Sequence, residues 1–339
     1  MSLAQGRVAK CVRKPSRLGL KRMVVLSTPE QSVQADEIAN LLGPGAAEVF
    51  TGAMMHTPIE VNEAAVAFVS DADGVVAIGG GSTTGLSKAI ALRTDLPQIA
   101  IPTTYAGSEM TPILGETNGG RKTTQSTLKV LPEVVIYDID LTLTLPPALS
   151  ATSGMNAIAH AVEALYAKDK NPIISLMASE GIAALARALP RIVKQPNEVE
   201  ARSDALYGAW LCGFCLGTVG MALHHKLCHV LGGLFNLPHA ETHTIILPHS
   251  VAYNAPAAEV AMERVRTALG VPDAAVGLYE LAGRLGASRA LKDIGMPPGG
   301  IDAAVEQALA SPYWNPRPLE PTALRRLLQR AYDGAPPAP

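Results

Sequence analysis

The sequence predicts a two-domain protein in which an α/β domain with a parallel sheet precedes an all-α domain. Short apolar runs, such as residues 23–27 and 74–78, alternate with helical stretches in the first part of the chain. After Leu145-Pro146-Pro147 the segments become long, rich in alanine and leucine, and helical in period. We therefore expect one domain over residues 1–147 and a second over residues 148–339.

The elements of the first domain follow from residue type and spacing. Continuous β-branched and aliphatic runs predict strands buried on both faces, and apolar residues three or four apart predict helices packed on the sheet. Strands are expected at residues 23–27, 48–50, 74–78, 99–101 and 134–137, and helices at residues 34–42, 59–69 and 87–92. This alternation predicts helices on both faces of a parallel sheet.

Composition and charge exclude several classes of protein. The net charge of -2 gives no basic surface for nucleic acid. No uninterrupted apolar run reaches the roughly 20 residues of a membrane span, and the N-terminus lacks the pattern of a signal peptide. We expect a cytoplasmic protein that binds neither nucleic acid nor membrane. Cys212 and Cys215 lie in an apolar helical run and are expected to be buried free thiols, the alternative being a zinc or redox motif.

Two polar turns follow consecutive predicted strands. Three glycines after residues 75–78 allow a phosphate to approach the backbone, and the amides that open the next helix attract negative charge. The spacing is neither GxGxxG nor GxxxxGK[ST], and a glycine turn can also occur without a ligand. Two such turns at strand carboxyl ends favour a nucleotide site. Its expected residues are Gly79, Gly80, Gly81, Ser82, Thr83, Thr103, Thr104 and Ser108.

Polar side chains recur at helical spacing in the second domain. Residues four apart on a helix share one face, and this spacing joins Asn156 to His160, His225 to His229, and His239 to His243. Their neighbours are apolar, and polar groups on an apolar face need partners or a cavity. Three pairs in one domain predict a shared functional pocket, although single core histidines would also satisfy each pattern.

Further expectations concern the surroundings of these pairs. Gly232, Gly233 and Pro238 are expected to break the helix so that the second and third pairs converge across a turn. His224 is expected to be peripheral, because it lies on the far side of its helix from His225. His249 is expected to have a structural role.

The chain resembles the iron-containing alcohol dehydrogenase superfamily along most of its length. The matching segments are residues 79–82, 102–104, 138–147, 153–164, 225–239 and 247–249. The resemblance implies a dehydroquinate synthase-like fold with a dinucleotide-binding domain, a helical domain and an active site between them. It places Lys122 and His56 near the cofactor, with an ordinary solvated lysine as the alternative for Lys122. Thr28 occupies the position of an acid that would bind the adenosine ribose, so we expect both NADH and NADPH to be used.

The departures from that pattern resemble the maleylacetate reductase subgroup. They are residues 102–111, 120–124 and 238–244, together with Asn156 in place of a metal-binding aspartate. The subgroup reduces the C=C bond of maleylacetate, a dicarboxylate, to 3-oxoadipate in aromatic catabolism. The resemblance implies a homodimer that needs no metal; a metal, if bound, would be held by His160, His225 and His239.

The same resemblance suggests roles for the polar pairs. His243 is the first candidate for substrate binding or proton donation, since it belongs to the distinctive segment of the subgroup. The other candidate catalytic residues are His229, His160, His225, His239 and Asn156. A metal-dependent alcohol or polyol dehydrogenase and a non-catalytic dinucleotide sensor are the alternative functions.

Overall fold

The computed structural model describes residues 2–6, 19–43, 47–119 and 121–338, and the side chains of residues 2–4, 47, 121 and 122 are not described. The chain divides into a first unit, Met1–Leu145, and a second unit, Pro146–Pro339. The sequence places this boundary after residue 147. An α/β unit followed by a helical unit confirms the predicted fold class.

The first unit is built on a six-stranded sheet in which every pairing is parallel. The strand order is β1-β8-β5-β4-β2-β3. The central strands are buried on both faces, which explains why they appear in the sequence as unbroken apolar runs. The strands are β1 (Ser2–Ala4), β2 (Met23–Leu26), β3 (Ala47–Phe50), β4 (Gly74–Gly79), β5 (Gln98–Pro102) and β8 (Val134–Asp138).

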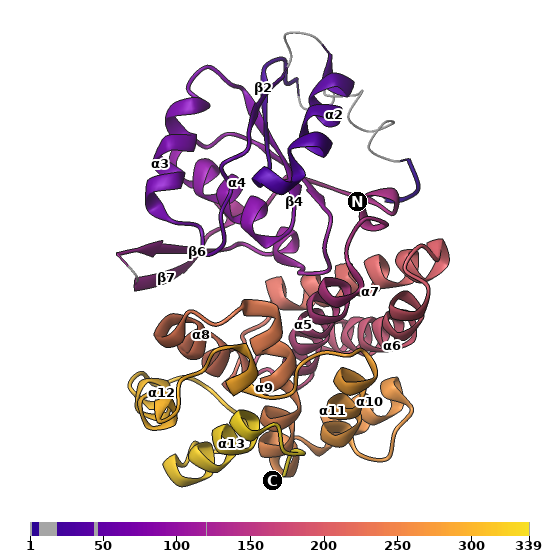
Figure 1. Cartoon of the computed structure of the whole chain (residues 1–339), viewed down its shortest axis with the longest axis vertical. Helices are drawn as coiled ribbons and strands as arrows, with labels where there is room; N and C mark the ends of the chain where they lie inside the picture. Colours follow the sequence, from indigo (N-terminus) through magenta and orange to yellow (C-terminus); the bar gives the residue numbers. More distant parts are fainter. Residues whose placement is uncertain (1, 7–18, 44–46, 120, 339) are drawn as a thin grey trace. The chain divides into compact units, whose positions relative to one another are not determined.

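Helices cover both faces of this sheet (Figure 1). Adjacent strand residues point to opposite faces, so Val25 packs with α2 (Ser32–Leu42), whereas Val24 packs with α3 (Ile59–Phe68) and α4 (Gly81–Thr94). The sequence predicts a later start for α4, at residue 87. That prediction is wrong because the glycine-rich segment is itself the first turn of the helix.

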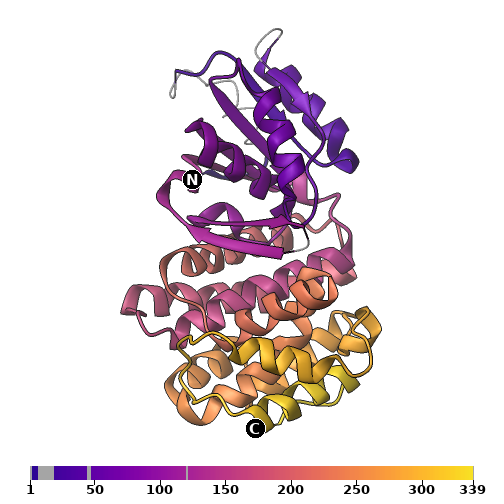
Figure 2. The ribbon, with the colours of Figure 1, turned by 90° about the vertical axis from the view of Figure 1, so that its left-hand side faces the viewer.

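An antiparallel pair of strands was not predicted by the sequence. β6 (Ile113–Asn118) and β7 (Arg121–Ser126) form a separate two-stranded sheet, labelled in Figure 1 and seen from another side in Figure 2. The described side chains of β7 are exposed and polar, so this strand lacks the apolar alternation that identifies a strand from sequence.

The second unit consists of helices, and its described residues, 146–338, contain no strand. α5 is its central element, with residues 150–166 buried throughout, and Gly154 lets it approach α6 closely. A Cβ atom at Gly154 would lie 2.5 Å from Leu189 Cδ2. The helices are α5 (Pro147–Tyr166), α6 (Pro172–Lys194), α7 (Val199–Thr218), α8 (Leu223–Phe235), α9 (His239–Asn254), α10 (Glu259–Leu269), α11 (Ala274–Arg284), α12 (Gly300–Leu309) and α13 (Pro321–Asp333).

α6 is long and apolar enough on average to cross a membrane. It carries Glu180, Arg187 and Arg191 along its length, and its apolar face packs against α5 and α7. This pattern is typical of a core helix of a globular unit.

Candidate functional site

The glycine turn joins the carboxyl end of β4 to the first turn of α4. Gly79 has a φ of 151°, and a Cβ atom there would lie 2.4 Å from Thr83 Oγ1 and 2.7 Å from Gln31 Oε1. Gly79 is therefore required by the packing of the turn itself. Gly81 is exposed, and a Cβ atom there would meet nothing within 4 Å. The backbone at the start of α4 is thus accessible to a phosphate group.

The second polar turn packs directly against the first. Thr103 N donates to Gly79 O at 3.0 Å, and a Cβ atom at Gly80 would lie 3.0 Å from Thr104 Cγ2. Gln31 Nε2 donates to Thr103 Oγ1 at 2.8 Å. The structure therefore brings Gly79, Gly80 and the two threonines together, as the sequence predicts. Gln31 was missed; its position just after β2, the strand beside β4, is the signal that could have identified it.

Lys88 attaches the distal end of the second turn to α4. Its Nζ donates to Ser108 O at 2.6 Å, Thr111 O at 2.7 Å and Ile113 O at 2.9 Å. Burial lowers the pKa of Lys88 to about 7, with Glu109 opposing the shift. The carbonyl groups offset part of the cost of burying the amine. Ser108 contributes its carbonyl to this anchor, and its side chain is partly exposed.

The turn after β2 contains a carboxylate that the sequence interpretation overlooked. Thr28 precedes a short 3-10 helix, η2 (Pro29–Gln31), and Glu30 lies exposed in it. A backbone hydrogen bond and one from the Thr28 side chain lower the pKa of Glu30. Glu30 therefore places a negative charge two residues beyond Thr28, and the expected use of both NADH and NADPH remains a prediction.

Two other predicted cofactor residues lie farther along the first unit. His56 has a left-handed backbone, with φ of 66°, and its carbonyl accepts a hydrogen bond from Thr117 Oγ1 at 2.9 Å. This contact ties the loop before α3 to β6. Lys122 pairs with Thr117 in the register of β6 and β7, but its side chain lies outside the described residues. Its predicted role remains a prediction.

Helices α5, α8 and α9 bring six histidines together in the second unit. His160 Nδ1 lies 2.9 Å from His225 Nε2, and His224 Nε2 lies 2.9 Å from His243 Nδ1. The ring centroids of His225 and His243 are 5.0 Å apart. Those of His239 and His243, the predicted pair on α9, are 4.3 Å apart. We call this group the histidine cluster: His160, His224, His225, His229, His239 and His243. The predicted convergence is therefore present in the structure.

Two expectations about this region are wrong. His224 is not peripheral but fully buried inside the cluster. These two consecutive residues point in different directions from α8. His225 therefore forms a hydrogen bond with His160 of α5, and His224 forms one with His243 of α9. Gly232 and Gly233 do not break α8, which continues to Phe235 and ends where Asn236 adopts a left-handed conformation with φ of 53°. The predicted break between the two pairs lies there instead, and Pro238 directly precedes α9.

Burial divides the cluster into an inner and an outer part. His160, His224, His225 and His243 are buried, whereas His229 and His239 are exposed. The pKa of His243 is well below its ordinary value, first because of burial and then because of the neighbouring histidines. Burial likewise lowers the pKa of His224. These two inner rings are thus neutral at neutral pH, when each carries one N–H group and one acceptor nitrogen.

Two buried polar side-chain atoms in this region have no hydrogen-bonding partner within the described residues. They are Asn156 Oδ1, on α5 one turn before His160, and His243 Nε2. Because unpaired polar atoms are costly to bury, such atoms often indicate where a ligand binds. They favour a binding function for the site over a purely structural one.

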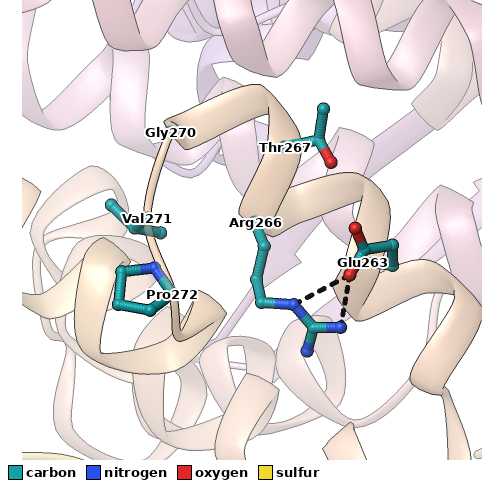
Figure 3. Close-up of a pocket in the computed structure, with 6 residues that line it drawn as sticks. All are labelled: Glu263, Arg266, Thr267, Gly270, Val271 and Pro272. Carbon is teal, nitrogen blue, oxygen red and sulfur yellow. Dashed lines mark hydrogen bonds and ion pairs between the residues drawn. The ribbon is translucent and has the colours of Figure 1, made fainter.

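Other predicted residues lie outside the cluster. His249 is buried in α9, and its Nε2 has no partner in the described part of the chain; burial lowers its pKa to about 4. Cys212 and Cys215 are buried and free, as expected. A surface depression near the end of α10, shown in Figure 3, contains none of the predicted site residues. Its side chains are dominated by the ion pair between Arg266 and Glu263.

Comparison with known proteins identifies the family. Residues 2–139 match the model of iron-containing alcohol dehydrogenase, and residues 150–332 match the C-terminal model of the Fe-containing alcohol dehydrogenase family. This chain belongs to the iron-containing alcohol dehydrogenase family. The match covers both units, so each of the two sites lies within a recognised part of the family fold.

The similar proteins within the family include several maleylacetate reductases. The chain is 57% identical to the maleylacetate reductase of Rhizobium sp. (strain MTP-10005), covering 95% of this chain and 92% of that one. The crystal structure of maleylacetate reductase from Agrobacterium tumefaciens has a TM-score of 0.95 and 55% identity, covering 99% and 96% of the two chains. Sulfoacetaldehyde reductase from Bifidobacterium kashiwanohense, solved in complex with NAD+, has a TM-score of 0.87 and 25% identity, covering 98% and 97%. The chain is a reductase of the maleylacetate reductase group.

The donor set implied for the family's iron is changed in this chain, although three histidines can still hold a zinc ion. The implied set offers neutral Asn156 and three imidazoles and contains no carboxylate to offset a divalent cation. Both ring nitrogens of His225 already have partners, Glu163 Oε2 at 2.6 Å and His160 Nδ1 at 2.9 Å. In the described part of the chain the one group with three ligand atoms within 4.8 Å is a different one, His224, Cys228 and His243.

The group formed by His224, Cys228 and His243 does not resemble a metal site. Its atoms are close because they form hydrogen bonds: His224 Nε2 lies 2.9 Å from His243 Nδ1 and 3.7 Å from Cys228 Sγ. Burial raises the pKa of the Cys228 thiol well above its ordinary value, whereas metal ligation needs the thiolate.

Proposed function

We propose that this chain reduces the C=C bond of maleylacetate to give 3-oxoadipate. In this proposal the protein is a cytoplasmic homodimer that acts in the breakdown of aromatic compounds. The single observation that carries the proposal is the histidine cluster with Asn156 beside it, in a chain 57% identical to a maleylacetate reductase. A neutral amide and several imidazoles suit a dicarboxylate substrate, because both supply hydrogen-bond donors without a resident cation.

The cofactor proposed for this reaction is NADH or NADPH, which supplies the hydride when bound. The chain contributes the exposed backbone at Gly81 and the amides that begin α4, which favour phosphate groups. Thr103, Thr104 and Gln31 line the adjoining turn and offer hydroxyl and amide groups to the same ligand. The relative solved with NAD+ supports a nicotinamide dinucleotide as the ligand class.

The loss of the metal-binding carboxylate at Asn156 is chemically consistent with an enone substrate. Hydride addition to a simple carbonyl places a full negative charge on one oxygen, for which a metal is the usual counter-charge. Addition at the alkene carbon β to a ketone gives an enolate, whose charge is spread over several atoms. Imidazole N–H groups can stabilise that charge by hydrogen bonds, and a histidine that has taken up a proton from solvent can pass it to the α carbon and return to the neutral ring.

His243 is the proposed first contact of the substrate in the cluster. Its Nε2 is buried without a partner in the described residues, so a substrate group that reaches it would complete its hydrogen bonding. Its neutral ring has a single N–H, and Nδ1 is already within hydrogen-bonding distance of His224. His239 is exposed, and its ring centroid lies 4.3 Å from that of His243. It is the proposed partner for a carboxylate of the substrate.

The experiment that tests this function is NADH oxidation by the purified protein with enzymatically generated maleylacetate, before and after exhaustive chelation. We expect turnover with maleylacetate and no change after chelation. Loss of activity that zinc or iron restores would refute the metal-free proposal. Turnover of butanol or a polyol instead, which the three retained histidines would allow, would indicate an alcohol dehydrogenase. Binding of NADH without turnover of either class would indicate a dinucleotide sensor.

A further inference from the structure

We propose that Glu163 is the positioning residue of the histidine cluster: it fixes the orientation and tautomer of His225 and, through His225, those of His160. The inference rests on the proposed function, because it assigns Glu163 a part in the same reaction. Glu163 lies on α5 and is fully buried, yet neither the amide–imidazole spacing nor the family's metal site includes it.

The surroundings of Glu163 consist of hydrogen-bond donors. Oε1 accepts from His224 N at 2.8 Å and from the Tyr166 hydroxyl at 3.4 Å. Oε2 accepts from Ala222 N at 3.0 Å and lies 2.6 Å from His225 Nδ1. Backbone amides can only donate, so both oxygens act as acceptors, as an ionised carboxylate does. The carboxylate is thereby attached to the segment that begins α8.

This arrangement determines which nitrogen of His225 carries a proton. Facing a carboxylate that already accepts from backbone amides, His225 Nδ1 is the donor. In the neutral ring Nε2 is then an acceptor, and it lies 2.9 Å from His160 Nδ1. His160 Nδ1 must donate, which leaves His160 Nε2 as the acceptor of its own neutral ring. One carboxylate thus orders two successive imidazoles, in the way that a carboxylate orients a histidine in hydrolytic triads and metal sites.

The same geometry explains why a carboxylate, and not an amide, suits residue 163. A glutamine has one acceptor oxygen and one NH2 group, and either orientation would direct N–H atoms at a backbone N–H of Ala222 or His224. Glu163→Gln keeps the side-chain volume but removes the reason for His225 to hold its proton on Nδ1. We expect the two rings then to populate mixed tautomers.

The first test uses the unmodified protein and needs no enzymatic activity. Nitrogen-15 NMR of the imidazole rings, assigned with His225→Ala, is expected to show a proton on Nδ1 of His225 and an unprotonated Nε2. A wild-type spectrum with the His225 proton on Nε2 alone would overturn the proposal. This outcome is independent of whether maleylacetate is the substrate, so failure of the proposed function and failure of this inference are distinguishable.

The second test is a double-mutant cycle on turnover at saturating NADH and maleylacetate. Glu163→Gln is expected to lower kcat roughly ten- to hundredfold, with little change in the KM for NADH. In a His225→Ala background the same change should lower kcat less than twofold, because its effect passes through His225. An equal loss in both backgrounds would mean that Glu163 merely holds the backbone that begins α8, and would overturn the proposal.

A matched control removes a hydrogen bond to the Glu163 carboxylate that does not come from a histidine. Tyr166→Phe removes the 3.4 Å contact to Oε1 and leaves the bonds to His225 and the backbone in place. We expect kcat within about twofold of wild type and an unchanged His225 spectrum. A loss as large as that of Glu163→Gln would show that any disturbance of the carboxylate suffices, which contradicts a specific action through His225.

Discussion

The glycine turn and the histidine cluster are built by opposite means. At the glycine turn, side chains are small or missing, and the backbone of Gly81 is exposed at the first turn of a helix. In the histidine cluster four imidazoles are buried. They form two hydrogen-bonded pairs, and the ring of His225 also forms a hydrogen bond with Glu163. The binding proposed for the first site needs free space around fixed backbone dipoles, whereas the second site depends on side-chain networks in a low-dielectric interior.

The difference has a consequence for how each site responds to change. A backbone site tolerates substitution except where an added side chain fills the space. A buried polar network loses much more when one member is removed, because its neighbours remain buried without partners.

The largest expected effect is that of His243→Ala in the cluster. Loss of one buried hydrogen bond to the developing enolate is worth about 2–4 kcal/mol, so kcat should fall by roughly two to three orders of magnitude. The dissociation constant for NADH should be unchanged, because the phosphate site belongs to the other unit. Steady-state kinetics and a fluorescence titration with NADH measure both quantities. Turnover equal to wild type would remove His243 from the reaction.

Acid is the next expected perturbation, and it acts on the buried imidazoles of the second unit. The pKa of His249 is about 4 in the folded protein, against about 6.5 in an unfolded chain. As the pH falls from about 6.5 to about 4, the unfolded chain binds a proton that the folded one does not, which costs roughly 3 kcal/mol of stability. His224 and His243 shift in the same direction.

Urea unfolding at pH 7.5, 6 and 5 measures this loss. His249→Gln cannot be protonated in this range, so its free energy of unfolding should depend less steeply on pH than that of wild type. Identical slopes in the two proteins would show that His249 does not contribute. Since His249 lies outside the histidine cluster, the same variant serves as a control for His243→Ala and should retain turnover.

Gly81→Val tests the backbone site with an intermediate effect. The added side chain meets no protein atom within 4 Å at its Cβ, so the free energy of unfolding should change by no more than about 0.5 kcal/mol. It would occupy the space proposed for a phosphate, and we expect the dissociation constant for NADH to rise roughly tenfold, or about 1.4 kcal/mol.

Gly79→Ala is the matched control for that substitution. Its Cβ would lie 2.4 Å from Thr83 Oγ1, so we expect loss of stability in addition to weaker binding. If Gly81→Val bound NADH as tightly as wild type, the phosphate would not lie at the start of α4, and the contrast between the two sites would fail.

Glu30→Gln should give the smallest effect. The exposed Glu30 carboxylate, in the turn after β2, is expected to disfavour the 2′-phosphate of NADPH. Exposed charges are screened, so neutralising it should raise the preference for NADPH over NADH by about two- to fivefold. The ratio of kcat/KM for the two cofactors measures this. An unchanged ratio would place the adenosine ribose away from Glu30.

Much of the first unit could be predicted, because a buried parallel strand appears in the sequence as an apolar run. β4 and the glycines that follow it were located in this way, and so was the second turn after β5. The β6–β7 pair was not, since the described side chains of β7 are exposed and polar and β6 has only two large apolar residues, Ile113 and Leu114. Gln31 and Glu30 were missed because their importance comes from the neighbouring strand, not from a local motif.

In the second unit, helical spacing determined which side chains share a face: His225 with His229, and His239 with His243. Which faces meet was decided by packing. His224 points away from His225 by about 100° around α8, and it meets His243 of α9 at 2.9 Å. The role proposed for Glu163 depends on hydrogen bonds to a distant segment, such as the one from Ala222 N, 59 residues away in the chain. Local sequence sets direction along a helix, whereas the buried network exists only once three helices exclude water from the space between them.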